Sequence, residues 1–183
     1  MEFVAFDFET ANYQRYSACS LGAVKVVDGI MVEHFYTLID PQTSFAASNI
    51  AIHGITADQV KGQPDYRETI LAFRDFVGEA PVVSHTQFDR AVIQSANERY
   101  GLDSLALDYF DSCQLARRIW RGKTQRFGLK PLCDLINFQF NHHNALEDAR
   151  AAAYIVQALG LYTKSQSIEE LLKSANINAF YTI

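Results

Sequence analysis

The stretch Phe3-Val4-Ala5-Phe6-Asp7-Phe8-Glu9 decides the fold class, because it is an apolar, strand-type run that ends in two acids. Alternate residues of a strand face the same side, so Asp7 and Glu9 should lie side by side. Neighbouring carboxylates repel each other unless a positive group lies between them, and a hard divalent cation with oxygen ligands is the usual candidate. The alternative is a solvent-facing strand end, which is the commoner case for an isolated Asp-x-Glu.

Strand-type segments recur along the chain in an order that predicts a mixed sheet. Two of them, at about 20–28 and 31–39, are joined by Asp28-Gly29, a two-residue hairpin signal. Two more, at 81–84 and near 107–110, alternate with segments of helical period. We therefore expect an α/β fold with a mixed five-stranded sheet, three antiparallel strands then two parallel ones, covered by helices near residues 66–78, 87–100, 112–120, 128–137 and 145–160.

Composition and length indicate one globular domain. The chain has 183 residues, 49% of them hydrophobic and 20% charged. We expect residues 1–162 to form the domain and 163–183 a C-terminal tail with one short helix, Ser167 to Ser174. No segment resembles a secretion signal or a membrane span, so we expect a cytoplasmic protein without membrane association. The three cysteines have neither disulfide nor zinc spacing, which indicates reduced, structural thiols at Cys19, Cys113 and Cys133.

Two acids on the later helices are aligned with apolar core positions. Asp89 is in line with Ile93 on one expected helix, and Asp148 is in line with Ala152 on another. Acids also favour the first turn of a helix for its macrodipole, which contributes about 0.3–1 kcal/mol, but that preference does not require an inward direction. Glu147 falls on a different face and fits a capping role. We interpret Glu147 as structural and Asp148 as functional.

Inward carboxylates are strongly destabilising if they are ionised, buried and unpaired, and divalent cations remove this conflict. Four acids form the set: Asp7, Glu9, Asp89 and Asp148. Oxygen ligands suit magnesium or manganese, whereas zinc recruits His or Cys more heavily. Two such ions side by side form a phosphodiester-cleaving arrangement, which also needs a proton acceptor. His143 precedes the last long helix and can lean over the cluster; His142 is its rival, and spacing alone does not choose between them.

Three motifs resemble those of the DEDDh 3′→5′ exonucleases, typified by the proofreading epsilon subunit of bacterial DNA polymerase III. They are Asp7-Phe8-Glu9-Thr10, Ser84-His85-Thr86-Gln87-Phe88-Asp89 and His143-Asn144-Ala145-Leu146-Glu147-Asp148-Ala149, the last with the family's spacing from histidine to aspartate. The resemblance covers roughly residues 3 to 160. Two further landmarks are similar to the family's: His53-Gly54-Ile55-Thr56, and Phe110-Asp111-Ser112 followed by Leu115-Ala116-Arg117.

The resemblance implies a ribonuclease H-like fold, two Mg²⁺ or Mn²⁺ ions as cofactors, the same four metal acids, and His143 as general base. It also implies that four residues surround the terminal nucleotide: Thr10, Ile52, His53 and Phe88. The second motif departs from the family, which commonly has His-Asn where this chain has Ser84-His85. That departure concerns contacts near the scissile phosphate and leaves the metal ligands unchanged. Asp111 is interpreted as the cap of the helix that begins at Ser112.

One basic segment is a candidate track for nucleic acid. Between Ser112 and Cys133 there are six basic residues and no acid, and the net charge of the chain is −5. Polyanion binding should therefore be local, and the residues expected to contact phosphates behind the 3′ end are Arg121, Lys123 and Arg126. The alternative is a solvated helix face and loop.

The expected function is a metal-dependent exonuclease that removes nucleoside 5′-monophosphates from the 3′ end of nucleic acid, with single-stranded DNA favoured. His143 takes the proton of the attacking water, and the ions stabilise the departing 3′ oxygen. One alternative is an RNA-directed enzyme resembling oligoribonuclease or ribonuclease T. Another is a non-catalytic nucleic-acid interaction module, against which the five catalytic positions argue. A replication or repair protein is a candidate partner; the sequence does not give the oligomeric state.

Overall fold

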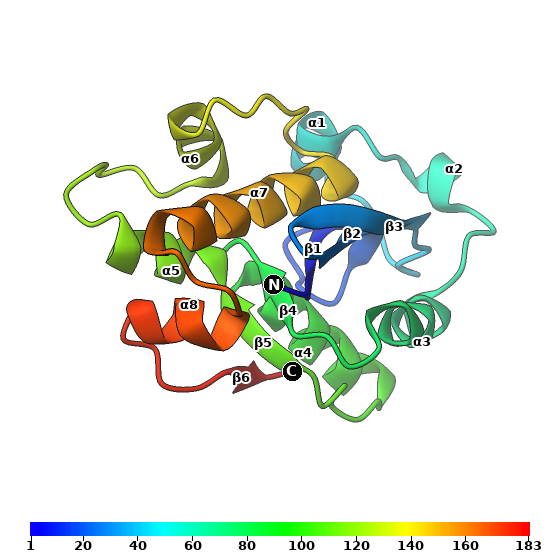
Figure 1. Ribbon diagram of the computed structural model, residues 1–183. Helices are drawn as coiled ribbons and strands as arrows, with labels where there is room; N and C mark the ends of the chain where they lie inside the picture. The colour runs from blue at the N-terminus through cyan, green and yellow to red at the C-terminus, as the bar shows by residue number, and fades with distance from the viewer.

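The computed structural model describes residues 1–183 and is built around one six-stranded sheet of order β3-β2-β1-β4-β5-β6 (Figure 1). β2 is antiparallel to both β1 and β3, β4 and β5 run parallel to β1, and β6 is antiparallel to β5. The five expected strands and their directions are confirmed, and the sixth was not expected. The strand bounds are β1 Phe3–Thr10, β2 Ala18–Val27, β3 Ile30–Leu38, β4 Val82–Ser84, β5 Asp108–Asp111 and β6 Tyr181–Thr182.

The β2–β3 hairpin turns at Asp28-Gly29, as the sequence predicts. Both residues have positive φ, 50° and 78°. A two-residue turn with two positive φ angles twists in the same sense as the strands it joins, which explains the choice of Asp-Gly.

Helices cover both faces of the sheet. One apolar core contains Phe3 and Ala5 of β1 with residues of α5, α6, α7 and α8, and the other contains Val4 and Phe6 with residues of α3 and α4. Because the side chains of β1 alternate between the two faces of the sheet, its odd-numbered residues face α7 and its even-numbered residues face α3 and α4. The helix bounds are α1 Ala47–His53, α2 Ala57–Val60, α3 Tyr66–Val77, α4 Phe88–Tyr100, α5 Ser112–Ile119, α6 Leu129–Leu135, α7 Ala145–Thr163 and α8 Ile168–Ser174.

The start of α7 lies directly on the sheet because of Gly22. Gly22 pairs with Asp7 across β1 and β2. A Cβ at this glycine would lie 2.2 Å from the backbone nitrogen of Leu146 and 2.3 Å from the carbonyl carbon of Ala145. Only glycine permits this approach, which places the first turn of α7 beside Asp7.

The C-terminal tail is packed on the domain. Leu171 and Leu172 of α8 belong to the core on the α7 side, and Ile183 belongs to the other core. The backbone of Ile183 exchanges two hydrogen bonds with that of Leu107, next to the β5–β6 pair. The sequence did not predict β6, because a strand of two residues shows no alternation of apolar and polar side chains.

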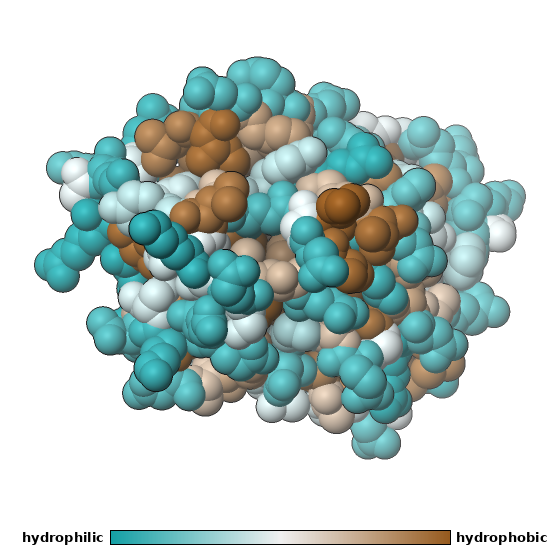
Figure 2. Space-filling model, viewed as in Figure 1, coloured by the Kyte–Doolittle hydropathy of each residue, from teal (hydrophilic) through white to brown (hydrophobic).

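The surface facing the viewer in Figure 1 carries two apolar areas, over α6 and over the β2–β3 edge (Figure 2). Exposed apolar residues of these elements include Leu135, Ile30 and Val32. None of the helices combines the length and the hydropathy that crossing a bilayer requires.

Candidate functional site

Three of the four predicted acids meet where the end of β1 lies beside the start of α7. Asp7 and Glu9 occupy odd positions of β1 and therefore face α7, where Asp148 stands in the first turn. One carboxylate oxygen from each of Asp7, Glu9 and Asp148 can be chosen so that all three lie within 4.8 Å of one another. Strand alternation and the close approach at Gly22 together produce this cluster.

Asp89 reaches the same region from the other face of the sheet. It stands in the first turn of α4, is 2% exposed, and accepts a hydrogen bond at 2.9 Å from the backbone N–H of Phe8. Phe8 lies between Asp7 and Glu9 in β1, so this bond fixes Asp89 to the strand that carries both acids. Asp89 is close enough to Asp7 and Asp148 to raise the pKa of Asp7 and to have its own pKa raised by Asp148.

The four acids are electrostatically unfavourable when they are ionised. Burial first, and then Asp89, Asp148 and Glu9, raise the pKa of Asp7 well above its usual range. Burial, and then Asp148 and Asp89, raise the pKa of Glu9 to about 7. Burial also raises the pKa of Asp89 to about 7, although the Phe8 N–H opposes it, and raises the pKa of Asp148.

The donor set of this cluster fits a hard divalent cation. No lysine or arginine forms an ion pair with any of the four acids. His142 pairs with Asp148 at 3.0 Å, but Asp7, Glu9 and Asp89 have no basic partner. Buried carboxylates of this kind need another source of positive charge. Because the donors are carboxylate oxygens, magnesium or manganese suits them better than a softer ion.

His142, and not His143, places its ring against Asp148. Nδ1 of His142 lies 3.0 and 3.1 Å from the two carboxylate oxygens, whereas His143 donates its backbone N–H to Oδ2 at 3.2 Å. The two imidazoles stack with centroids 4.0 Å apart. Partial burial and His142 lower the pKa of His143, against the opposing effect of Asp148. A lowered pKa keeps the His143 imidazole neutral at pH 7, the form that accepts a proton. Its role as general base stays a prediction.

The residues expected around a terminal nucleotide line a cavity of about 270 Å³ next to the acids. Thr10, Ile52, His53 and Phe88 all contribute to it, together with Glu9. Ile52 and Phe88 are half-exposed apolar side chains, which suits contact with a flat base, and Thr10 is buried. The structure thus brings the four predicted residues together with one of the predicted metal acids.

His53 supports the wall of this cavity through hydrogen bonds to the backbone. Its Nδ1 accepts a hydrogen bond at 3.0 Å from the backbone N–H of Ile55, so the proton of the neutral ring is on Nε2. Nε2 then donates to the carbonyl oxygen of Thr10 at 3.1 Å. Burial lowers the pKa of His53, which favours this neutral form. Both ring nitrogens bond to the protein, so His53 offers a ring face rather than a free donor to a ligand.

Four other residues of the cavity were not predicted from the sequence: Asn12, Tyr13, Arg15 and Asn49. Arg15 lies over the ring of Phe88, with Cζ 5.2 Å from the centroid, and Asn49 donates to the Thr10 carbonyl at 2.9 Å. Arg15 and Tyr13 follow the first acid motif in the β1–β2 connection. Their proximity to the acids along the chain was the available signal.

Ser84-His85, the departure from the family pattern, is tied into the protein interior. His85 Nδ1 lies 2.8 Å from Oγ of Ser112, and Nε2 lies 3.0 Å from the carbonyl oxygen of Phe127. Asp111 accepts a hydrogen bond from the backbone N–H of Gln114 at 3.0 Å, which confirms its role as a helix cap.

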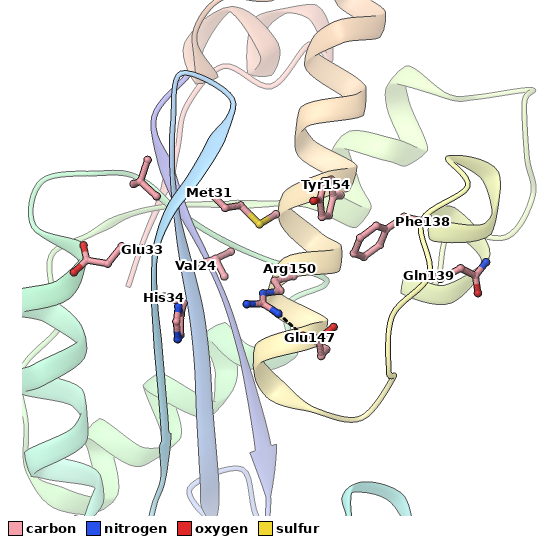
Figure 3. Close-up of a pocket in the computed structure, with 10 residues that line it drawn as sticks. Val24, Met31, Glu33, His34, Phe138, Gln139, Glu147, Arg150 and Tyr154 are labelled. Carbon is pink, nitrogen blue, oxygen red and sulfur yellow. Dashed lines mark hydrogen bonds and ion pairs between the residues drawn. The ribbon is translucent and has the colours of Figure 1, made fainter.

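Glu147 points away from the acid cluster into a different cavity. That cavity, of about 410 Å³, lies between β3 and α7, and Glu147 pairs there with Arg150 (Figure 3). The side chain of Asn144 caps α7 by accepting from the backbone N–H of Glu147. The Glu147 carboxylate is thus engaged by Arg150, on a different helix face from Asp148.

The three residues expected to contact phosphates, Arg121, Lys123 and Arg126, lie in one loop between α5 and α6. Lys123 lies over the ring of Tyr162, 4.2 Å from its centroid, in the last turn of α7. Asp148 is in the first turn of α7, so a helical rise of about 1.5 Å per residue puts Tyr162 about 20 Å along the helix from Asp148. Arg121 forms a bridge with Thr124 in the same loop, which lies at the far end of α7 from α1 (Figure 1). Arg126 belongs to the same loop, where its backbone N–H donates to Oγ1 of Thr124 at 3.0 Å.

Comparison with known proteins identifies homologous sequences over most of the chain. The RNase T family model, described as an exonuclease, matches residues 4–156. The PolC-type DNA polymerase III of Halalkalibacterium halodurans is 30% identical over 159 residues, and that of Clostridium perfringens is 32% identical over 160 residues. Each match covers 85% of this chain, which spans about 11% of the length of these polymerases.

Solved structures share the fold. Exonuclease X, in complex with 5′ overhanging duplex DNA, has a TM-score of 0.71 at 23% identity and covers 94% of this chain and 99% of its own. The nuclease domain of 3′hExo, a DEDDh family member bound to rAMP, has a TM-score of 0.75 at 14% identity and covers 86% and 90%. The expected ribonuclease H-like architecture is confirmed.

Proposed function

The chain belongs to the RNase T exonuclease family, as a DEDDh 3′–5′ exonuclease of the metal-dependent hydrolases, and from this premise we propose its substrate and mechanism. It releases nucleoside 5′-monophosphates from the 3′ end of single-stranded DNA by a two-metal mechanism. The observation that carries this proposal is the adjacency of the acid cluster, centred on Asp7, to the cavity lined by Glu9, Thr10 and Phe88.

The four acids are proposed to hold two divalent ions. Asp7, Glu9 and Asp148 supply oxygens within reach of one ion, and Asp89 stands next to this group with one oxygen already bonded to Phe8. When bound, the ions supply the positive charge that stabilises the attacking and departing oxygens of the phosphodiester. The raised pKa values of Asp7 and Glu9 support this assignment, because bound cations would offset the burial and mutual repulsion that disfavour the ionised acids.

The cavity is proposed to orient the last nucleotide. Phe88 and Ile52 offer apolar surfaces on which a base can stack, and stacking accepts any base. His53 and Asn49 hold the Thr10 carbonyl in place, which fixes the end of β1 relative to α1. The terminal phosphodiester then lies next to Glu9, which belongs to both the cavity and the acid cluster.

His143 is proposed to accept the proton of the attacking water. Its ring is exposed beside Asp148, and its lowered pKa favours the neutral form. His142 is the weaker candidate because Nδ1 is already engaged by Asp148. The ring nitrogens of His143 have no hydrogen-bond partner in the protein, and its backbone N–H donates to Oδ2 of Asp148 at 3.2 Å, which holds the residue beside the acid cluster.

DNA is favoured over RNA by the relatives. The PolC-type DNA polymerases are 30–32% identical to this chain, whereas 3′hExo, which was solved with rAMP, is 14% identical. Exonuclease X, solved with duplex DNA, is 23% identical. The same relationship to polymerases supports a replication or repair protein as a partner.

An end-labelling experiment tests the proposal. Single-stranded DNA, duplex DNA and RNA of one sequence, each 5′-labelled, are incubated with the chain and Mg²⁺ or Mn²⁺. We expect single-stranded DNA to shorten from its 3′ end one nucleotide at a time, and Asp7→Asn to be inactive. Faster shortening of RNA would favour the RNA-directed alternative, and no shortening of any substrate would favour a binding module.

A further inference from the structure

A loop of fixed shape, residues 120–128 between α5 and α6, carries the basic side chains of Arg121, Lys123 and Arg126, and we call it the basic loop (Figure 1). The backbone N–H of Lys123 donates to the carbonyl oxygen of Trp120 at 2.9 Å, which closes a turn with Gly122 at φ +87°. Trp120 is buried in the core on the α7 side, so it anchors the start of the loop. A loop that is ordered before binding loses less conformational freedom when a ligand arrives.

The C-terminal end of the basic loop is bonded to His85. Nε2 of His85 lies 3.0 Å from the carbonyl oxygen of Phe127, and Nδ1 lies 2.8 Å from Oγ of Ser112. Burial lowers the pKa of His85 and favours the neutral ring. A carbonyl oxygen only accepts, so Nε2 carries the proton and Nδ1 accepts from the Ser112 hydroxyl. His85 lies between β4 and α4, so it joins the basic loop to the segment that leads into Phe88 and Asp89.

Another part of the basic loop packs at the far end of α7. Nζ of Lys123 lies 4.2 Å from the centroid of the Tyr162 ring, and Tyr162 is 52% exposed. Tyr162 lies about 20 Å along α7 from Asp148 at a rise of about 1.5 Å per residue. A helical strand of nucleic acid advances about 3.4 Å per nucleotide, so about six stacked nucleotides cover this distance. The basic loop therefore extends from the segment before Phe88 to a point that only a longer oligonucleotide reaches.

Phosphate is the ligand chemistry that the basic loop fits. The chain has a net charge of −5, whereas residues 120–128 hold three basic side chains and no acid. All three basic residues are exposed. An ordered positive loop on a negative protein concentrates a polyanion at one place. The exposed ring of Tyr162 adds a surface on which a base can stack.

We propose that the basic loop binds the strand upstream of the 3′ end and that His85 is the residue that positions this loop. His85 holds the end of the loop against the segment that carries Phe88 and Asp89, so phosphates on the loop keep a fixed register with the terminal nucleotide. His85 itself touches no substrate, because both ring nitrogens are bonded within the protein. The identity of the strand rests on the proposed function; the attachment of the loop to His85 does not.

Fluorescence anisotropy of the full chain in EDTA tests the binding. The probe is labelled oligo(dT) of about twelve nucleotides, about twice the length that reaches Tyr162. The parent is compared with His85→Asn and His85→Gln. The amide nitrogen of Gln reaches about as far as Nε2 and still donates to Phe127, whereas that of Asn reaches only as far as Nδ1. We expect the affinity to fall about threefold to tenfold in His85→Asn and less in His85→Gln, because one buried hydrogen bond contributes on this scale.

The matched control is His34→Asn, a change of an exposed histidine of β3, and circular dichroism confirms that each variant is folded. We expect the control to bind oligo(dT) as the parent does. Unchanged affinity in His85→Asn, an equal loss in the control, or no binding of oligo(dT) by the parent would overturn the proposal.

Cleavage with Mg²⁺ separates positioning from a general structural role. The readout is the ratio of kcat/KM for the same oligo(dT) to kcat/KM for a thymidine dinucleotide. We expect this ratio to fall at least threefold in His85→Asn and to stay unchanged in His34→Asn. A merely structural role would lower both constants equally, and an unchanged ratio would overturn the positioning role. If the parent cleaves neither substrate, the proposed function fails, and the anisotropy still decides whether His85 positions the loop.

Discussion

Replacing Asp7 with Asn should stabilise the metal-free protein at alkaline pH while abolishing its activity. Asp7 has three acids near it, and its pKa is raised by burial and by each of them. The pKa of the adjacent Glu9 rises from 4.5 to about 7, which corresponds to about 3 kcal/mol of unfavourable free energy in the ionised folded state. Neighbouring acids remain buried in the variant, so we expect a gain of about 1–3 kcal/mol in the free energy of unfolding, or about 2–12 °C in Tm.

The sign of the pH dependence follows from the raised pKa values. The folded chain keeps its protons to higher pH than the unfolded chain, so the stability of the parent falls as pH rises from about 4.5 to about 7. The advantage of Asp7→Asn should therefore be present at pH 8 and largely absent at pH 4.5. Added Mg²⁺ should raise the Tm of the parent more than that of the variant, because a ligand stabilises the state that binds it.

Thermal unfolding in EDTA, at pH 4.5 and pH 8, measures this difference. Asp75→Asn is the matched control, because Asp75 is an exposed acid of α3 far from the cluster in sequence. A variant no more stable than the parent at pH 8, or equally stabilised at both pH values, would refute the electrostatic reasoning.

Three further predictions follow from the same geometry. His143→Ala should lower kcat by a factor of roughly 10² to 10⁴ with little change in magnesium affinity, whereas His142→Ala should lower kcat much less. Equal losses of kcat in the two variants would show that the general base was wrongly chosen. Gly22→Ala should lower the free energy of unfolding by about 1–3 kcal/mol and lower kcat, because its methyl group pushes the start of α7 from β1; denaturant unfolding that matches the parent would contradict this. Replacing Arg121, Lys123 and Arg126 together with Ala should weaken the binding of long oligonucleotides and flatten the salt dependence of their affinity, while cleavage of a dinucleotide is unchanged. Identical salt slopes for the variant and the parent would mean that these residues form a solvated surface.

The sequence was informative where local patterning determines geometry. The alternation of β1 predicts that Asp7 and Glu9 share a face, and the structure puts that face against α7. Helical spacing likewise predicts that Asp148 turns inward while Glu147 does not, and Glu147 pairs with Arg150 in a separate cavity. Turn residues and capping residues likewise predicted the positions of the hairpin and the helices, because these residues act on the local backbone.

Features that depend on contacts between distant segments were not accessible from patterning. The approach of α7 to the sheet at Gly22 depends on a crossing that a single glycine does not reveal. The ring that contacts Asp148 is that of His142, while His143 uses its backbone N–H, and spacing does not distinguish between two consecutive histidines. The sequence shows that the basic residues are clustered but not where the cluster lies, which depends on the packing of Lys123 on Tyr162 at the far end of α7.

The most direct test of the central claim is mass spectrometry of the product of single-stranded DNA digestion in ¹⁸O-labelled water with Mg²⁺. If the acid cluster directs water to the terminal phosphodiester, the released product is a nucleoside 5′-monophosphate with one ¹⁸O atom on its phosphate, and Asp7→Asn releases none. Products that carry a 3′-phosphate, an unlabelled phosphate in the first turnover, or undiminished release by Asp7→Asn would contradict the account.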